Sequence, residues 1–257
     1  MKRARIVGWL DGTLKVGAFD DVSNNGLQMD AAACGLGDDA RVSTVAFAVD
    51  ASVRAVEAAA MVGAQLLVVH HGISWGGGIR RVVGGVGRVV RAAFEREVSV
   101  YACHLPLDAH PTLGNNAQLA KLLALKKVKK AFSYHGNVIG LTGEGVSARV
   151  FESLKAMGLS PDSLAAQTLK SSNAQTLRVG VCSGGAGEFA EEAKRLGCDL
   201  YITGEASWGD VIAAENCGMK MLCLGHYATE VFGVRALAKA MRRSLKVKTV
   251  DLTDSLR

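Results

Sequence analysis

The sequence has little proline, few aromatic residues and no long apolar run. Among its 257 residues are three prolines, and phenylalanine, tryptophan and tyrosine together make up 5% of the chain. The aliphatic run 66–69 ends at His70, far short of the ~20 apolar residues that a membrane-spanning helix needs. We therefore exclude a transmembrane protein. With 49% hydrophobic and 21% charged residues, the chain is expected to fold around a substantial core.

The chain also lacks the cysteine spacing of disulfide scaffolds and zinc ribbons. Its six cysteines form no C-x-x-C pair, and several lie inside apolar, strand-like runs. Such cysteines are typical of buried thiols in cytosolic proteins. The apolar stretch 6–10 behind the basic N-terminus is too short for the core of a signal peptide. We therefore expect a cytoplasmic protein with no membrane contact.

Positive charge is only slightly in excess. Thirty lysines and arginines against 24 acidic residues give a formal net charge of +6, spread along the whole sequence. The densest basic run, 126–130, is most simply a solvated edge strand. Because no motif interleaves basic and aromatic residues, nucleic-acid binding is not the favoured function, although the net charge leaves it open.

Strand-like apolar runs alternate with helical patterns, which is typical of βαβ units and mainly parallel sheets. Two such sets are separated by a glycine-rich, strand-like stretch from 126 to 146. We therefore predict an α/β protein of two domains, the first comprising 1–125 and 226–257 and the second 126–225. The strands are expected at 43–49, 65–70, 98–103, 177–182, 199–203 and 219–224. The helices are expected at 3–17, 52–62, 88–96, 115–124, 148–157, 187–196, 207–216 and 228–243, with a turn-rich loop at 20–30.

Four of the six histidines follow predicted strands. His70 and His71 end one strand, His104 follows the next, and His226 follows the last strand of the second set. In open parallel sheets, ligands bind beyond the carboxyl ends of the strands. These histidines therefore occupy positions that a binding site would use, whereas His110 and His135 are expected to be surface residues.

Two of these histidines carry a carboxylate four residues later. Asp108 follows His104 at this offset and Glu230 follows His226, so each pair shares one face if a helix begins there. Imidazole and carboxylate ligands suit Zn²⁺, Mn²⁺ or Fe²⁺, and a carboxylate can bridge two ions. We therefore hypothesise a dinuclear metal site.

A simpler interpretation competes with each part of this site. A single histidine at a strand end is usually a hydrogen-bonded polar residue, and the spacing H-x-x-x-D also arises by chance. The adjacent pair His70 and His71 is harder to explain this way, because neighbouring side chains of a strand point to opposite faces and both imidazoles need partners.

Two glycine-rich segments have open interpretations. The segment 183–187 lies between a strand and a helix, where it can receive an anion or simply make a tight turn, which is the favoured role. The segment 72–87 follows the paired histidines and is equally consistent with a lid and with a flexible connection.

The combination of motifs resembles the Nif-three-like proteins, also called GTP cyclohydrolase I type 2 homologues. The matching motifs occur in the family's order across most of the chain: DDVSNNGLQ (20–28), AVDAS (48–52), GAQLLVVHHG (63–72), HLPLD (104–108), VGVCSGGAG (179–187), CDLYITGE (198–205) and GHYATE (225–230). Two departures are Glu205, where the family often has aspartate, and 72–74, where the family is often more hydrophobic.

The resemblance implies two α/β domains, a ring-shaped hexamer and two divalent metal ions in the cleft between the domains. It places His71 and Asp108 on one ion, His70 and His226 on the other, and Glu230 between both. His104 matches a family histidine close to the metals. The resemblance leaves the substrate open, because fold and family do not fix function.

Three functions are therefore considered. The first is a metal-dependent hydrolase of a nucleotide or of another small phosphorylated or cyclic compound, with His104 as a candidate proton shuttle. The second is a metal-binding or regulatory ring that binds a partner protein without catalysis. The third is a basic ring that engages nucleic acid, which a steep salt dependence would reveal.

Overall fold

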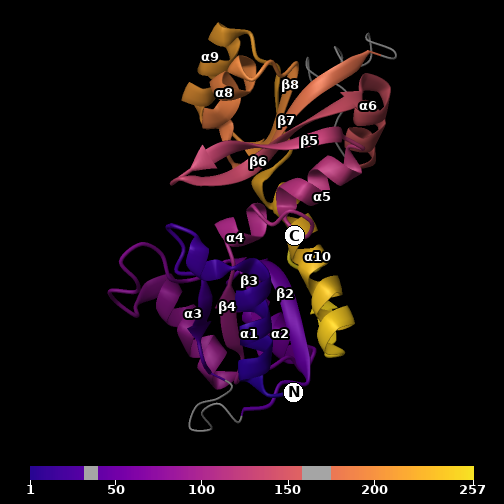
Figure 1. Ribbon diagram of the computed structural model, residues 1–257. Helices are drawn as coiled ribbons and strands as arrows, with labels where there is room; N and C mark the ends of the chain where they lie inside the picture. Colours follow the sequence, from indigo (N-terminus) through magenta and orange to yellow (C-terminus); the bar gives the residue numbers. More distant parts are fainter. Residues whose placement is uncertain (32–39, 158–174) are drawn as a thin grey trace. The chain divides into compact units, whose positions relative to one another are not determined.

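The computed structural model describes residues 1–31, 40–157 and 175–257. The chain divides into two compact units, which are described separately: unit 1 comprises 1–113 and 233–257, and unit 2 comprises 114–232 (Figure 1). The second passage between them lies within helix α10 (His226–Leu245). The domain boundaries expected from the sequence, 125/126 and 225/226, remain predictions.

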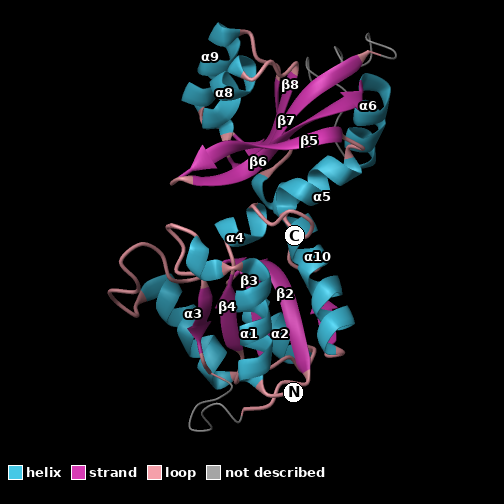
Figure 2. Cartoon of the chain, in the orientation of Figure 1, coloured by secondary structure: helices cyan, strands magenta, loops and turns pink. Residues whose placement is uncertain are grey.

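Unit 1 contains a five-stranded sheet in the order β1-β4-β3-β2-β10 (Figure 2). Strands β4, β3, β2 and β10 run parallel, and the edge strand β1 pairs antiparallel with β4. The strands are β1 (Gly26–Met29), β2 (Thr44–Asp50), β3 (Leu66–His71), β4 (Ser99–Ala102) and β10 (Lys248–Asp251). Strand β3 is therefore the central strand, and its carboxyl end is flanked on both sides by the ends of parallel strands.

Helices cover both faces of this sheet, as a buried parallel sheet requires. The helices of unit 1 are α1 (Arg3–Leu14), α2 (Val53–Met61), α3 (Gly84–Glu95), α4 (Leu105–Asp108) and most of α10, with a 3-10 turn η1 at Val16–Ala18. Alternate residues of β2, β3 and β4 form one core with α2 and α3. Helix α1 lies on the opposite face, where the Tyr101 hydroxyl donates to Asp11 Oδ1 at 2.7 Å.

Unit 2 contains a second five-stranded sheet, in the order β5-β6-β7-β8-β9. Its strands are β5 (Lys126–Tyr134), β6 (Asn137–Val146), β7 (Thr176–Gly185), β8 (Leu200–Glu205) and β9 (Met221–Cys223). Strands β7, β8 and β9 are parallel, whereas β5, β6 and β7 pair antiparallel. A two-residue hairpin joins β5 to β6, with positive φ at both His135 (46°) and Gly136 (74°). This sheet is therefore mixed, while the predicted two-domain α/β class is confirmed.

Two helical layers cover the sheet of unit 2. Helices α5 (Asn115–Leu122) and α6 (Ser147–Ala156) form a core with alternate residues of β7 and β8. The aromatic contacts among Phe132, Phe189 and Tyr201 form part of the other layer, beside η3 (Gly187–Phe189), α8 (Ala190–Arg195) and α9 (Trp208–Cys217).

Several elements differ from those expected. Strand β1 lies inside the segment expected to be a turn-rich loop, and the short elements β10 and α4 were not predicted. Helix α1 stops at Leu14 because Lys15 adopts a left-handed conformation with φ 53°. Helix α3 begins at Gly84, so the last four residues of the glycine-rich segment 72–87 start a helix.

The structure also tests what the composition predicted about thiols, charge and membrane-spanning helices. Cys103, Cys182 and Cys198 are buried thiols as expected, whereas Cys217 is half-buried and Cys223 exposed; Cys34 lies outside the described residues. The lysine-rich run forms the exposed edge strand β5, as predicted. Across the described part of the chain, none of the helices has the length and apolar character needed to cross a membrane.

Candidate metal centre

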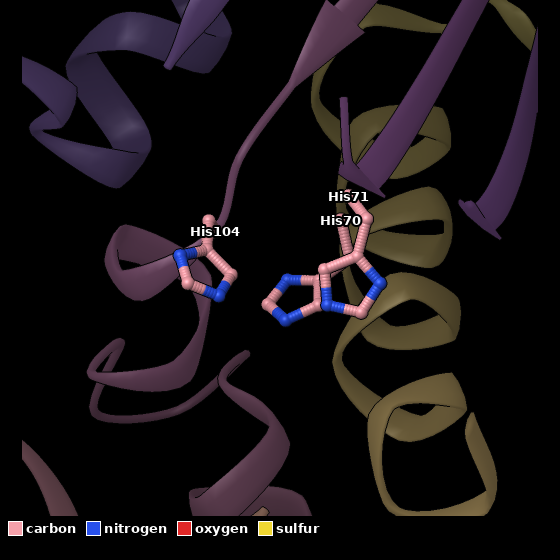
Figure 3. A group of neighbouring side chains, drawn as sticks. All are labelled: His70, His71 and His104. Carbon is pink, nitrogen blue, oxygen red and sulfur yellow. The ribbon is translucent and has the colours of Figure 1, made fainter. Parts of the chain in front are cut away.

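Three histidines of unit 1 converge at the carboxyl edge of its sheet. His70 and His71 end the central strand β3, and His104 follows the neighbouring strand β4. Figure 3 shows the three imidazoles turned toward a common space, and one ligand nitrogen from each ring lies within 4.8 Å of the others. The strand-end prediction is therefore confirmed for these residues, which form a group able to hold a metal ion.

His70 is completely buried, and its hydrogen bond defines which ring nitrogen faces the group. Its Nδ1 lies 2.9 Å from the Cys103 carbonyl oxygen. Because a carbonyl oxygen only accepts, Nδ1 carries a proton and Nε2 keeps a lone pair in the neutral ring. That Nε2 lies 3.6 Å from Asp108 Oδ2. A lone pair and a carboxylate repel each other unless a cation joins them, so this pair suits a metal ion or a proton.

His71 is oriented by a carboxylate on the adjacent strand. Its Nδ1 lies 2.8 Å from Asp50 Oδ1, and the parallel register places Asp50 directly beside His71. The carboxylate stabilises a proton on Nδ1, which leaves Nε2 as the ligand atom. Asp50 therefore has the same role for His71 as the Cys103 carbonyl has for His70.

His104 is held by the segment that precedes β1. Its Nδ1 lies 2.8 Å from Asp21 Oδ1, and its backbone N–H donates to Asn25 Oδ1 at 2.7 Å. Asp21 Oδ2 accepts hydrogen bonds from the Leu105 N–H and from the side-chain amide of Asn25. Burial alone would raise the pKa of Asp21, but hydrogen bonding and attraction to His104, with further donors from Asn25 and Ser23, outweigh burial and lower the pKa.

Unit 2 carries a second group of candidate metal ligands at the start of α10. His226 is the first residue of this helix and Glu230 follows one turn later, with 3.2 Å between His226 Nε2 and Glu230 Oε1. His226 Nδ1 lies 2.9 Å from Oε1 of Glu205, the last residue of β8. His226 thus resembles His71, since a carboxylate at the end of a parallel strand binds its Nδ1. The helix begins two residues earlier than predicted, which brings His226 onto the face of Glu230.

Glycines make room for this group. A Cβ at Gly184, where φ is +70°, would lie 2.5 Å from Glu230 Oε1, and one at Gly204 would lie 2.7 Å from Thr229 Oγ1. The Gly184 N–H donates to this same Thr229 hydroxyl at 3.0 Å. The glycine segment 183–187 therefore makes the tight turn favoured from the sequence, and its lack of side chains admits the Glu230 carboxylate.

A common hydrogen-bond pattern links the four histidines of the two units. In each of them Nδ1 lies 2.8–2.9 Å from an oxygen that accepts a hydrogen bond, so Nε2 is the nitrogen that would bind a metal ion. Metal-binding histidines in proteins show this arrangement, because the outer partner fixes the tautomer and the ring orientation. The residues present therefore fit divalent metal ions that accept imidazole and carboxylate ligands.

All six residues predicted for the site belong to these two groups. Unit 1 brings together His70, His71, His104 and Asp108, and unit 2 brings together His226 and Glu230. The other two histidines lie elsewhere: His135 is exposed, as expected, but His110 is half-buried and accepts the N–H groups of Thr112 and Leu113 at Nδ1. Burial lowers the pKa of His110.

The residues that orient the histidines were not predicted from the sequence. Asp50 and Glu205 stand at strand ends, so the rule that found the histidines also applies to them. Asp21 and Asn25 reach His104 only because β1 pairs with β4, which aligns Gly26 with Ala102. Their signal in the sequence was the DDVSNNGLQ motif, which carried the family resemblance without indicating a contact.

Comparison with known proteins agrees with the motifs. The sequence profile of the family described as Duf34/NIF3 (NGG1p interacting factor 3) matches residues 1–255. A relative from Pyrococcus horikoshii, named GTP cyclohydrolase 1 type 2 homolog, is 40% identical, with 97% of both chains covered. A protein of the same name from Archaeoglobus fulgidus is 36% identical, with 98% of both chains covered.

Solved structures show the same fold. The protein TTHA1606 from Thermus thermophilus shares 29% identity with a TM-score of 0.78, and 98% of both chains is covered. The protein ybgI, described as of unknown function, shares 28% identity with a TM-score of 0.82 over the same share. Profile, relatives and fold agree over nearly the whole length, which confirms the resemblance: this chain belongs to the Duf34/NIF3 family.

Proposed function

We propose that this protein binds two divalent metal ions per chain and uses them to hydrolyse a nucleotide or another small phosphorylated or cyclic compound. In this proposal the donor groups of the two units form one centre. His71 and Asp108 would hold the first ion, His70 and His226 would hold the second, and Glu230 would serve as a ligand of both. The donor set suits Zn²⁺, Fe²⁺ or Mn²⁺.

The observation that carries the proposal is the shared orientation of the four imidazoles. A carbonyl or carboxylate oxygen lies within 2.9 Å of each Nδ1, so each ring presents Nε2. In the pairs His70–Asp108 and His226–Glu230, that nitrogen faces a carboxylate. In each pair two hydrogen-bond acceptors face each other, and a divalent cation would relieve their repulsion; His70 and Asp108 are buried, whereas His226 is half-buried beside the buried Glu230.

Each residue has a distinct role in the proposed reaction. Divalent metal ions, when bound, make water a nucleophile near neutral pH and polarise the group under attack. Glu230 is almost completely buried and its Oε1 lies 3.2 Å from His226 Nε2, so its carboxylate would contribute a negative charge to a cation held beside that ring. His104 is oriented by Asp21 and moves a proton between the reacting groups.

The names of the relatives support a nucleotide or cyclic substrate. The relatives from Pyrococcus horikoshii and Archaeoglobus fulgidus are both named as homologues of a GTP cyclohydrolase. Opening the guanine ring requires attack by water at C8, and the same activated water suits a phosphoester. The proposal therefore includes both substrate classes and favours neither.

A second function is favoured by the description of the family. The name NGG1p interacting factor 3 refers to a protein interaction. In this alternative the metal groups stabilise a ring-shaped hexamer that binds a partner protein, and no substrate is converted. Turnover that disappears on chelation and returns with added metal would separate the hydrolase from this alternative.

Metal content tests the proposed centre directly. We expect elemental analysis of protein purified without chelator to give close to two metal ions per chain. His226→Ala removes a ligand of the second ion and Glu230→Ala removes a ligand of both ions, so each substitution should lower this content. The matched control is His135→Ala, which removes an exposed histidine outside both groups. Full metal content in both ligand variants would refute the ligand assignment.

A further inference from the structure

An exposed tryptophan lies beside the histidine group of unit 1. The Trp75 ring centroid is 5.2 Å from that of His104, in an edge-to-face arrangement, and 6.0 Å from that of His71. The side chain retains 38% of its accessible surface. An aromatic ring that is partly open to solvent therefore lies directly beside two of the imidazoles.

The backbone around Trp75 is fixed by the segment that also holds His104. Gln28 Oε1 accepts the N–H groups of Ile73 and Ser74, and the Asn24 N–H donates to the Ser74 carbonyl. Trp75 itself forms a bridge with Ser23. Because these contacts fix the residues between His71 and Trp75, this part of the segment 72–87 does not have the character of a flexible connection.

The polar atom of Trp75 is already used inside the protein. Its indole N–H donates to the Gly72 carbonyl at 2.9 Å. Gly72 accommodates this packing, since a Cβ there would lie 2.2 Å from Gln28 Oε1. With its N–H satisfied, the indole offers a bound molecule its π face and apolar edge rather than a hydrogen bond.

We propose that Trp75 stacks on a planar heteroaromatic ring of the substrate, such as a nucleobase, and selects for molecules that carry one. The inference rests on the proposed metal centre, because it places the ring beside His71 and His104. A role in packing alone would be complete with the indole buried, whereas the observed indole is partly exposed and rigidly held at the edge of the donor group. A fixed aromatic surface binds bases of any sequence through their π faces.

Two ligands that differ only in the ring provide the test. Guanosine 5′-monophosphate and ribose 5-phosphate share the sugar and the phosphate, and calorimetry on metal-loaded protein compares their affinities. We expect the nucleotide to bind more tightly. Trp75→Leu keeps an apolar side chain but removes the aromatic face, and should weaken nucleotide binding by about 5- to 150-fold with ribose 5-phosphate unchanged. Trp75→Phe should restore most of the preference.

A spectroscopic readout separates stacking from a merely structural role. The chain has three tryptophans, so replacing Trp9 and Trp208 by phenylalanine leaves Trp75 as the only indole. The nucleotide should then quench its fluorescence and ribose 5-phosphate should not. The control Trp208→Ala removes another exposed indole, on α9 of unit 2, and should leave both affinities unchanged.

The outcomes distinguish this inference from the proposed function. Equal affinities for the two ligands, failure of the nucleotide to bind, or an unaltered preference in Trp75→Leu would overturn the stacking role, whatever the metal content. Conversely, a preference that depends on Trp75 in protein that holds no metal would support the stacking role and contradict the proposed centre. Metal analysis of each variant therefore accompanies the binding measurements.

Discussion

At the scale of single residues, the carboxylates behind the histidines determine the character of the site. Asp21 is the most constrained of them, because its two oxygens accept hydrogen bonds from His104, Leu105, Asn25 and the Ser23 N–H. Its side chain is 2% exposed. A carboxylate that accepts several hydrogen bonds while buried stabilises the fold only as long as it stays ionised.

Replacing this carboxylate tests its contribution to stability. Asp21→Asn turns one accepting oxygen into a donor that faces other donors, so the free energy of unfolding should fall by about 1.5–3 kcal/mol at pH 7. Because the folded-state pKa of Asp21 lies below its ordinary value of 3.8, the stabilisation is complete above that value. It is lost as the pH falls through the lowered pKa.

Urea unfolding of chelator-treated protein at several pH values measures this effect. The difference between wild type and Asp21→Asn should be constant from neutral pH down to about pH 5 and should shrink at still lower pH. Glu57→Gln, at an exposed position of α2, is the control and should change little. A difference that grows on acidification would contradict the sign of the pKa shift.

Site residues were predictable from the sequence where local rules place them, and not where contacts between distant parts of the sequence place them. The paired histidines, His104 and His226 were predictable because parallel strands place their carboxyl ends at one edge of a sheet. Glu230 followed from its helical spacing to His226, whereas Asp108, predicted from its spacing to His104, lies beside His70. Trp75 and Asp21 were not predictable in this way, because their contacts depend on the packing of the segment 21–28 against the chain after β3 and after β4.

At the scale of elements, the sequence predicted the long buried strands and missed β1 and β10, the two short strands at the edges of the first sheet. Strands β2, β3 and β8 are apolar runs whose burial on both faces follows from helices above and below the sheet. Strands β1 and β10 have four residues each and form by pairing with neighbours far away in the sequence. Local composition carries little information about such strands.

Replacing glycine by alanine should change the stability of the protein in opposite directions at two positions, depending on the space around the added Cβ. In β6, a Cβ at Gly140 would lie 2.5 Å from the Phe132 ring and 2.8 Å from the Val181 carbonyl oxygen. Gly140→Ala should therefore destabilise the protein by about 1–3 kcal/mol through overpacking. In α1, a Cβ at Gly8 would meet nothing within 4 Å. Gly8→Ala should stabilise it by up to about 1 kcal/mol, since alanine favours a helix.

The two substitutions serve as controls for each other, because both add one methyl group. Chemical denaturation of the two variants and the wild type under one set of conditions gives both changes in unfolding free energy. Equal effects of the same sign would show that the space around the Cβ does not decide the outcome.

At the scale of the whole molecule, the proposed donor set is divided between the two units. Unit 1 supplies His70, His71 and Asp108, and unit 2 supplies His226 and Glu230, on a helix that continues into unit 1. The folding of each unit therefore orients only its own ligands. A centre that needs both sets couples metal binding to the joint stability of the two units.

We also expect the chain to assemble as a hexamer. Large apolar side chains such as Met61, at 82% exposure, and Trp208, at 77%, are of the kind that subunit contacts bury. Sedimentation velocity at micromolar concentration should give about six times the chain mass of 26.9 kDa. A species of single-chain mass under these conditions would rule out the ring.

Loss of a proposed metal ligand and loss of the proposed proton shuttle should affect catalysis by the assembly to different extents. Turnover of GTP or of a generic phosphoester should disappear on chelation and return with Zn²⁺, Mn²⁺ or Fe²⁺, and should rise with pH as the attacking water loses its proton. Glu230→Ala removes the proposed bridge and should reduce turnover to background. His104→Ala should reduce it by about 10²- to 10⁴-fold while the protein keeps its metal, since the ring is proposed to move a proton rather than to bind an ion. Equal rates in wild type and Glu230→Ala would show that the hydrolysis arises elsewhere, and would favour the partner-binding function.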